Sequence, residues 1–368
     1  MSNTESKHIK GVNLGNWLVL EKWMHPDLFA GTTAEDEDEL CRQLPRPELE
    51  KRLKEHRDTY ITKSDFEYIK QLGLNTIRIP VPHFIFGDDP EYCLPYVSCI
   101  EYLDLAFDWA EALDLKILID VHTAPESQNG FDNGGICGVC KWAQSEDRIQ
   151  RLLDVLEKLA ERYGKREGLW GIEMLNEPIS EPMWQSIPKR YPPHDPQRAE
   201  GSDFVPLKTL KEFYLKGYEV LRRHMDSSKA IVIHDGFRYE VWSGFMTGPE
   251  YENVILDAHW YLGFGATANM APSEMMSGVM KDCCRKLEIM QKTMPVIIGE
   301  WCVSNDCVHA PAISEAEKNL IYRMIGAAQL LIWEKAHGYF FWSYKLISNA
   351  EGWDLRKAVE NGWLPEKF

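Results

Sequence analysis

The chain has 368 residues, of which 44% are hydrophobic, and a formal net charge of −16 at pH 7. The hydrophobic content supports a large core and gives no reason to expect disorder beyond the ends. The acidic balance disfavours nucleic acid and anionic membrane surfaces as partners, so we expect a neutral substrate.

Eight short apolar segments recur along the chain, each followed by turn residues or by an amphipathic stretch. An apolar run bounded by turn residues is typical of a strand that is buried on both faces. The predicted strands are residues 12–15, 76–81, 116–122, 171–175, 230–234, 254–260, 296–299 and 339–344, and the predicted helices are 100–113, 147–163, 207–224, 279–292 and 314–337.

Strands that alternate with helices pair in parallel through right-handed crossovers. Eight of them predict an α/β fold of the closed (β/α)8 type, a TIM barrel, as a single domain over residues 1–368. The alternative is an open doubly wound sheet. That fold normally carries a glycine-rich phosphate turn after its first strand, and GVNLG at 11–15 does not fit the pattern.

Two segments interrupt the alternation of strands and helices. Residues 32–55 are highly charged and are interpreted as a solvated helix-and-loop insertion. Residues 179–206 are rich in proline and show no period, and an unstructured connection of that length is uncommon unless it is functional or disordered. Because this second insertion follows the fourth strand directly, we expect it to lie over the active face.

The fourth and seventh strands each lead into a glutamate. GIEMLNEP carries Glu177 and PVIIGEW carries Glu300. Parallel strands bring their carboxyl ends to one rim, where the active sites of barrels lie. Cleavage of a glycosidic bond requires two carboxyl groups, one to protonate the leaving oxygen and one to attack or to activate water. Either glutamate alone is more simply a helix cap or a loop charge, but the pair favours catalysis.

Polar or aromatic residues accompany the predicted ends of all eight strands. If each residue is considered alone, the simpler interpretation is structural. A single histidine would be a buried core residue, a single arginine would be an ordinary ion-pair partner, and a single tryptophan would be a core aromatic. Their joint placement at strand ends predicts a site instead. Besides Glu177 and Glu300, these residues are Asn13, Glu21, Arg78, His122, Asn176, His234, Asp235, His259, Tyr261 and Trp342.

Longer runs carry a family resemblance that spans the barrel from its first strand to its last. The chain resembles glycoside hydrolase family 5 of clan A, and within it the exo-β-1,3-glucanases of fungi. The SQNGFDN run at 127–133 is highly specific in combination with the NEP and GEW pair. The matching runs are GVNLGNWLVLE (11–21), LGLNTIRIPV (72–81), DVHTAPESQNGFDN (120–133), GIEMLNEP (171–178), IVIHDGF (231–237), DAHWY (257–261), IIGEW (297–301), FFWSYK (340–345) and EGWDLRKAVENGWLP (351–365).

The resemblance implies a retaining double displacement. Glu300 matches the family's nucleophile and Glu177 its acid/base. Arg78 and Tyr261 are expected to keep Glu300 ionised by lowering its pKa. Glu177 is expected to be protonated at rest, with a pKa raised by burial and by a negative neighbour.

The resemblance also implies a sugar-binding set. Asn176 matches the residue that binds the sugar 2-hydroxyl in the family, and His122 and His259 match the histidines of the same subsite. Trp342 matches the aromatic platform under the sugar ring. Glu21 and Asp132 match the two acids that close the pocket of the exo-glucanases. His234 and Asp235 are interpreted as structural, because the fifth strand has no strong catalytic role in this family.

Three features depart from the fungal enzymes. Those enzymes are secreted and disulfide-bonded, whereas MSNTESKHIK has no apolar core segment, so we expect neither a signal peptide nor a membrane anchor. Asn16 stands where the family commonly has glycine, and the insertion at 179–206 replaces a short loop. In that insertion Trp184, Arg190 and Tyr191 are candidates for binding the unit beyond the scissile bond.

The cysteines indicate a reducing compartment. There are nine, an odd number, and no Asn-x-Ser/Thr acceptor occurs, so we expect a cytoplasmic protein. Cys137 and Cys140 have zinc-knuckle spacing, but no second pair accompanies them, and a pair of free thiols is the simpler interpretation. No metal and no organic cofactor is expected.

These observations predict an exo-acting retaining β-glycosidase that removes the terminal non-reducing sugar of short β-linked oligosaccharides. A β-glucoside of the β-1,3 type is the first choice of substrate, and a β-mannosidase acting on short mannose-containing oligosaccharides is the alternative. A non-catalytic carbohydrate-binding barrel is the alternative from another class. Loss of one glutamate is its usual signature, and both glutamates are present.

Overall fold

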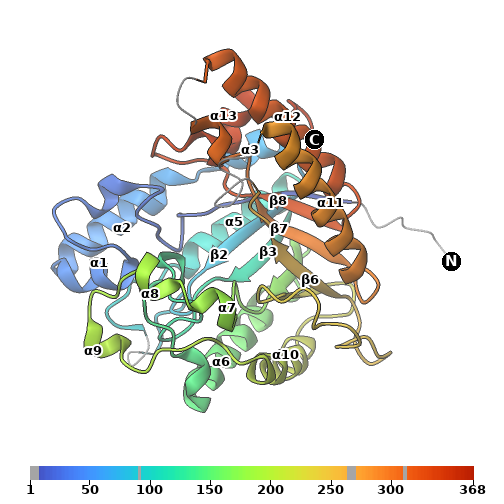
Figure 1. The fold of residues 1–368 in the computed structure, drawn as a ribbon. Coiled ribbons are helices and arrows are strands. Elements are labelled where there is room, and N and C mark those ends of the chain that lie inside the picture. The colour runs from blue at the N-terminus through green and yellow to red at the C-terminus, as the bar shows by residue number, and fades with distance from the viewer. Residues whose placement is uncertain (1–7, 90–92, 263–270, 310–312) are drawn as a thin grey trace.

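The computed structural model describes residues 8–89, 93–262, 271–309 and 313–368. Eight parallel strands pair in chain order and close into a barrel (Figure 1), so the predicted fold class is confirmed. The segment 1–7, for which the sequence predicts no export signal, lies outside the described residues. The strands are β1 (Ile9–Asn13), β2 (Thr76–Val81), β3 (Lys116–Val121), β4 (Leu169–Glu173), β5 (Ala230–His234), β6 (Val254–His259), β7 (Val296–Trp301) and β8 (Gly338–Phe341).

Helices cover the outside of this barrel, with α6 beside α10 and α11 beside α12 (Figure 1). The segment 235–253 joins β5 to β6 through turns without a helix. No helix among the described residues is both long and apolar enough to cross a bilayer. The main helices are α1 (Glu37–Gln43), α2 (Arg46–Tyr60), α3 (Lys63–Gln71), α5 (Ile100–Ala112), α6 (Glu146–Tyr163), α10 (Leu207–Arg222), α11 (Pro272–Met290), α12 (Glu315–Trp333) and α13 (Leu355–Glu360).

Helix α6 shows how the sequence makes these covering elements. The Ser145 side chain accepts the Arg148 backbone N–H and so caps the helix at its start. Leucines and a tyrosine at three- and four-residue spacing then form one buried stripe, and charged residues occupy the outer face. The buried stripe includes Leu152, Leu156, Leu159 and Tyr163.

The interior of the barrel changes from apolar to charged along the strands. Because side chains alternate across a strand, residues two apart share its inner face. Leu118, Val232 and Ile255 belong to one buried apolar cluster within the barrel. Two residues further along the same strands lie three buried polar side chains, Asp120, His234 and Asp257. The apolar layer therefore supports a charged layer just below the carboxyl ends of the strands.

Several predicted boundaries needed correction, and two of them concern the glutamates. β4 ends at Glu173, so Glu177 lies four residues beyond the strand, whereas Glu300 lies within β7. β1 begins at Ile9 rather than at residue 12, and β8 ends at Phe341 rather than at 344. Strand ends are fixed by hydrogen bonds to neighbouring strands, which a local apolar pattern does not contain.

The charged start of the segment 32–55 is not solvated. Asp36, Glu37 and Asp38 are buried. The Asp36 side chain accepts the N–H of Glu39 at the start of α1 and the N–H of Cys137 from another loop. Carboxylates that accept backbone N–H groups can be buried, which the charge pattern alone does not reveal.

The segment 179–206 contains three four-residue helices rather than an unstructured connection. They are α7 (Glu181–Trp184), α8 (Ile187–Arg190) and α9 (Pro196–Ala199).

Candidate active site

A cavity of about 570 Å³ opens where the loops leave the carboxyl ends of the strands. Acidic side chains and aromatic rings share its lining, and both glutamates singled out in the sequence are among them. Its lining residues are Glu21, Trp23, Phe131, Asp132, Asn133, Glu177, Met183, Arg190, Tyr191, Phe237, Tyr261, Glu300, Trp342 and Trp353.

Glu300 is held by one donor at each carboxylate oxygen. Arg78 Nη1 donates to Oε1 over 3.0 Å, and the Tyr261 hydroxyl donates to Oε2 over 2.5 Å. The side chain is 2% exposed. Two donors on one buried carboxylate fix its orientation, so the remaining lone pairs face the cavity.

Arg78 is fully buried beneath Glu300 and serves several partners at once. Its guanidinium donates to Asn13 and Glu300 through Nη1, to Asn176 through Nη2 and to Glu173 through Nε. Asp120 and Asp257 also lie within 4.0 Å of it. One cation shared among four carboxyl groups cannot neutralise them all. Burial raises the pKa of Glu173 well above its ordinary value, which keeps a proton in this layer.

Glu177 adopts an unusual backbone conformation. Its φ is 47°, in the left-handed region, and its side chain is 5% exposed. Asn133 Nδ2 donates to Oε2 over 3.0 Å, and His259 Nδ1 lies 2.8 Å from Oε1. A non-glycine residue at positive φ costs free energy and occurs most often at functional sites.

His259 lies between the two glutamates. Its Nδ1 is 2.8 Å from Glu177 Oε1 and 3.4 Å from Glu300 Oε2. Because one atom is this close to both, these two carboxylate oxygens are less than roughly 6.5 Å apart, and this is the lower limit for the two carboxyl groups of inverting glycosidases. The short spacing agrees with a retaining pair.

The protonation of this trio differs from the expectation. Burial acts to lower the pKa of His259, but the charges of Glu300 and Asp257 outweigh it, and the pKa lies well above its ordinary value. Burial likewise acts to raise the pKa of Glu177, but the hydrogen bond and charge of His259 outweigh it, so the pKa is lowered. Both directions favour the proton on His259 over the proton on Glu177, and the 2.8 Å contact joins the two groups.

The pKa of Glu300 also shifts against the expectation. Burial raises it, and the attraction of the His259 and Arg78 charges does not compensate. The neighbouring Glu177 charge also raises the pKa of Glu300, and the charge of Arg78 is divided among several carboxylates.

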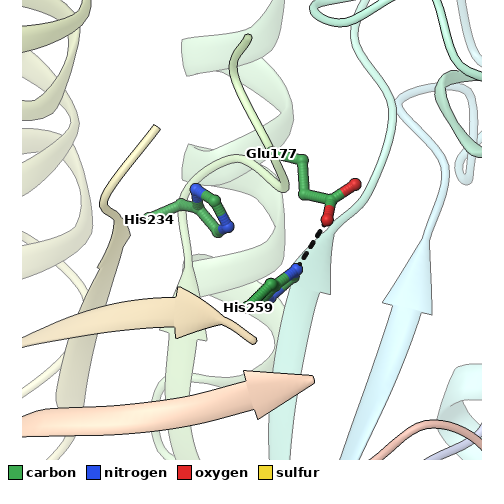
Figure 2. A group of neighbouring side chains, drawn as sticks. All are labelled: Glu177, His234 and His259. Carbon is green, nitrogen blue, oxygen red and sulfur yellow. Dashed lines mark hydrogen bonds and ion pairs between the residues drawn. The ribbon is translucent and has the colours of Figure 1, made fainter. Parts of the chain in front are cut away.

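His234, interpreted from the sequence as structural, lies beside Glu177 and His259. Figure 2 shows its ring turned toward both residues, and the two imidazoles pack edge to face at 4.4 Å. Its Nδ1 accepts the N–H of Gly236, so its proton sits on Nε2. Burial lowers the pKa of His234 well below its ordinary value, which keeps the ring neutral.

Glu177, His234 and His259 could each offer one donor atom to a metal ion, all within 4.8 Å of one another. Their protonation does not suit this purpose. A metal needs unprotonated ring nitrogens. His259 carries a proton toward Glu177, and the free nitrogen of His234 bears hydrogen. An ion bound here would have to displace these protons.

His122 connects Trp342 of the cavity wall with Asn176 behind it. The rings of Trp342 and His122 stack at 5.6 Å with a 7° interplanar angle. His122 Nδ1 contacts Asp120, and its Nε2 lies 3.4 Å from Asn176 Nδ2. Trp342 faces the cavity, whereas His122 and Asn176 support it from below.

Glu21 and Asp132 bring two further acids to the cavity. Trp23 Nε1 donates to Glu21 Oε2 over 2.8 Å, and Glu21 Oε1 has no partner among the described residues. Burial and the neighbouring Asp132 raise the pKa of Glu21 well above its ordinary value. Burial raises the pKa of Asp132 to about 6. These carboxyl groups can donate as well as accept hydrogen bonds near neutral pH.

Asn16 holds Glu21 in place. Its φ is 62°, a conformation that asparagine tolerates better than most residues. Its Oδ1 accepts the backbone N–H of Glu21 over 2.8 Å. Asparagine thus fits a position where a glycine would adopt the same backbone but could not make this contact.

The insertion at 179–206 contributes directly to the cavity wall. Arg190 and Tyr191 line it, as does Met183, which the sequence did not single out. Trp184 instead packs over Gly130, outside the lining. The wall also includes residues that no sequence argument identified: Trp23, Phe131, Asn133, Phe237 and Trp353. Asn133 adjoins Asp132 within the SQNGFDN run, but only the structure reveals its contact with Glu177.

Comparisons with known proteins agree with this geometry. A family model described as "Cellulase (glycosyl hydrolase family 5)" matches residues 46–345. The "Probable glucan 1,3-beta-glucosidase A" of Aspergillus fumigatus is 34% identical, covering 97% of this chain and 87% of the relative. The protein of the same description from Emericella nidulans is 34% identical, over 99% and 91% of the two chains. The solved structure of rutinosidase from Aspergillus niger superposes with a TM-score of 0.77 at 20% identity, covering 97% of each chain, which shows the shared fold.

Proposed function

Because the chain belongs to glycoside hydrolase family 5 and is therefore a retaining glycosidase, we propose that it is an exo-acting β-glucosidase. Its substrates are short β-linked gluco-oligosaccharides, with the β-1,3 linkage first, and it removes the terminal non-reducing glucose. The observation that carries this proposal is the acidic cavity around the glutamate pair, together with relatives named glucan 1,3-beta-glucosidase.

In the proposed reaction Glu300 attacks the anomeric carbon. The bond from that carbon to the leaving oxygen breaks, and Glu177 gives the oxygen a proton that it has received from His259. In the second step Glu177 takes a proton from water, the water oxygen attacks the anomeric carbon, and Glu300 is released. The 2.8 Å contact between Glu177 and His259 supports this proton route.

The exo mode rests on Glu21 and Asp132. Both line the cavity, and the unpartnered Glu21 Oε1 is free to accept a hydroxyl of a terminal sugar. Trp342 provides a platform for the ring, and Asn176, buried behind the lining beside Glu177, is the ligand for its 2-hydroxyl that the family resemblance implies. On the leaving-group side, Arg190 and Tyr191 line the wall and bind the next unit of the oligosaccharide.

The roles of the glutamates are tested by Glu177→Ala and Glu300→Ala. Each change should lower kcat on an aryl β-glucoside about 10³-fold, because it removes the acid/base or the nucleophile. Azide should restore turnover in both variants with different products. Glu177→Ala should give the β-glucosyl azide, because the glycosyl-enzyme still forms, and Glu300→Ala the α-glucosyl azide. Near-normal turnover in either variant, or the reverse pair of products, would contradict the roles.

The sugar is tested with a panel of aryl β-glycosides that differ only in the glycone. We expect the highest kcat/KM for the glucoside. A mannoside turned over faster than the glucoside would replace the proposal with a β-mannosidase, since one axial hydroxyl separates the two sugars.

We also propose the cytoplasm as the compartment. All nine cysteines are free thiols in the structure, which supports a reducing environment. Fractionation of the source cells should recover the activity with cytosolic markers.

A further inference from the structure

The insertion at 179–206 places Met183, Arg190 and Tyr191 in the cavity wall, yet it has little regular structure of its own. Its helices α7, α8 and α9 have four residues each. Helices this short are not stable without tertiary contacts. The position of the wall therefore depends on what the insertion binds outside the cavity.

Two glycines let the insertion approach the 127–141 loop. Gly130 has a φ of 72°, and a Cβ there would lie 2.9 Å from the ring of Trp184. Gly138 has a φ of 68°, and a Cβ there would lie 2.7 Å from the Tyr191 carbonyl oxygen and from Pro193. These contacts fix the first part of the insertion, up to residue 193.

The second part is held by charge. Arg198 Nη1 donates to Asp38 Oδ2 over 2.6 Å, and Arg198 Nη2 donates to Glu126 Oε1 over 2.7 Å. Asp38 lies on α1, and Glu126 lies on the loop after β3. One guanidinium thus joins three segments that are far apart in the sequence. His194 and Glu39, 2.9 Å apart, form a second link to α1.

The acceptors of Arg198 are themselves fixed. Asp38 is 2% exposed, and its carboxylate also accepts from Arg42 and from the Tyr96 hydroxyl. The Asp38 backbone N–H donates to the Gly135 carbonyl, which lies in the loop that carries Asp132. Helix α1 therefore supports both the insertion and the loop that carries Asp132.

We propose that Arg198 is a positioning residue that determines leaving-group specificity. By bridging Asp38 and Glu126 it holds the insertion so that Arg190 and Tyr191 can contact the sugar beyond the scissile bond. The bridge requires the planar fork of arginine, which reaches two carboxylates at once, whereas lysine offers a single point charge. The inference rests on the proposed function only for the identity of the leaving group.

The kinetic test compares Arg198→Met and Arg198→Lys with the unchanged protein on two substrates. For a β-1,3-linked glucotriose we expect kcat/KM to fall about tenfold or more, mainly through KM, because positioning is lost. For an aryl β-glucoside with a small leaving group the change should stay within about twofold, since that substrate does not reach the insertion. Equal losses on the two substrates would overturn the proposal.

Arg42→Met is the matched control. Arg42 makes two hydrogen bonds to the same Asp38 carboxylate but lies on α1 itself, so its removal leaves the bridge to the insertion intact. We expect the control to keep the substrate ratio of the unchanged protein. A control that shifts this ratio as far as Arg198→Met does would show that Asp38, and not the bridge, is responsible.

Limited proteolysis tests whether the insertion is held in place, and it needs no substrate. Trypsin cleavage after Lys189 or Arg190, followed by mass spectrometry, should be at least about tenfold faster in Arg198→Met, because local opening exposes the segment. Arg42→Met should be cut at the rate of the unchanged protein. Unchanged cleavage in Arg198→Met would overturn the proposal. If no glucoside is hydrolysed at all, the proposed function fails, and the cleavage rates still decide the role of Arg198.

Discussion

At the scale of single residues, His259 determines where the protons of the site reside. Its Nδ1 lies within 3.4 Å of both glutamates, and its pKa is raised well above its ordinary value despite burial, because of the charges of Glu300 and Asp257. The proton that Glu177 delivers is thus favoured on the imidazole, one hydrogen bond away. Groups coupled this closely titrate as a unit.

A change at His259 should therefore alter the pH profile as well as the rate. In His259→Asn the proton is no longer held by an imidazole of raised pKa, and Glu177 must retain it alone. We expect the basic limb of kcat/KM to move to lower pH, and kcat/KM for substrates with poor leaving groups to fall about 100-fold. Profiles measured with a good and a poor aryl leaving group check both effects.

His224→Asn is the control for this change. His224 lies on the surface beside Glu157, so its replacement should leave both limbs in place. If the basic limb of His259→Asn coincides with that of the unchanged protein, His259 does not hold the proton of the acid.

At the scale of elements, the wall of the cavity is built by loops that dock on one another. The insertion at 179–206 contacts the 127–141 loop at Gly130 and Gly138, and α1 supports both segments. The charge pattern of residues 32–55 suggested a solvated insertion. Its buried acids instead bind backbone and arginine groups of these loops.

Gly138→Ala tests this docking. A Cβ at Gly138 would lie 2.7 Å from Pro193 and from the Tyr191 carbonyl, and the φ of 68° is itself unfavourable for alanine. We expect a loss of unfolding free energy of about 2–4 kcal/mol and a raised KM for oligosaccharides. Urea denaturation and steady-state kinetics measure the two effects.

Gly201→Ala separates strain from contact. Gly201 has a φ of 77° in the same insertion, but a Cβ there would meet no atom within 4 Å. Only the backbone cost of about 1 kcal/mol should appear, with no change in KM. Equal losses in the two variants would mean that the close approach at Gly138 contributes nothing.

At the scale of the whole molecule, the net charge of −16 is accompanied by carboxyl groups that are buried rather than solvated. Burial raises the pKa of several of them: to about 6 for Asp36 and Asp132, and to about 7 for Glu37 and Asp235. A group whose pKa is raised by folding binds its proton more tightly in the folded state. Its contribution to stability is complete below the unfolded pKa and is lost as the pH rises through the folded value.

These carboxyl groups should therefore make the folded protein less stable at pH 8 than at pH 5. Glu37→Gln keeps an acceptor for the Leu20 N–H and removes the ionisation. Folding raises the pKa of Glu37 from 4.5 to about 7. In Glu37→Gln we therefore expect the difference in unfolding free energy between pH 5 and pH 8 to shrink by about 2–3 kcal/mol. Urea denaturation at both pH values measures it. An unchanged difference, or the same change in Glu35→Gln at the exposed end of this segment, would contradict the assignment.

The sequence by itself determined the barrel and the pairing of Glu177 with Glu300. Runs of apolar residues and the turns that follow them are local properties, and the topology of parallel strands then brings their carboxyl ends to one rim. Strand ends were less accurate: β2 and β5 coincide with the predicted ranges, whereas β4 ends two residues early and places Glu173 inside the barrel.

Only the tertiary structure decided where the protons lie and which loop residues reach the cavity. Glu177 meets His259 across 82 positions of sequence, and Arg198 meets Asp38 across 160. His234 and Asn133 come beside Glu177, while Trp184 packs elsewhere. A pKa depends on burial and on every charge within a few ångströms. Those distances follow from the packing of segments remote in the chain, and no local pattern in the sequence contains them.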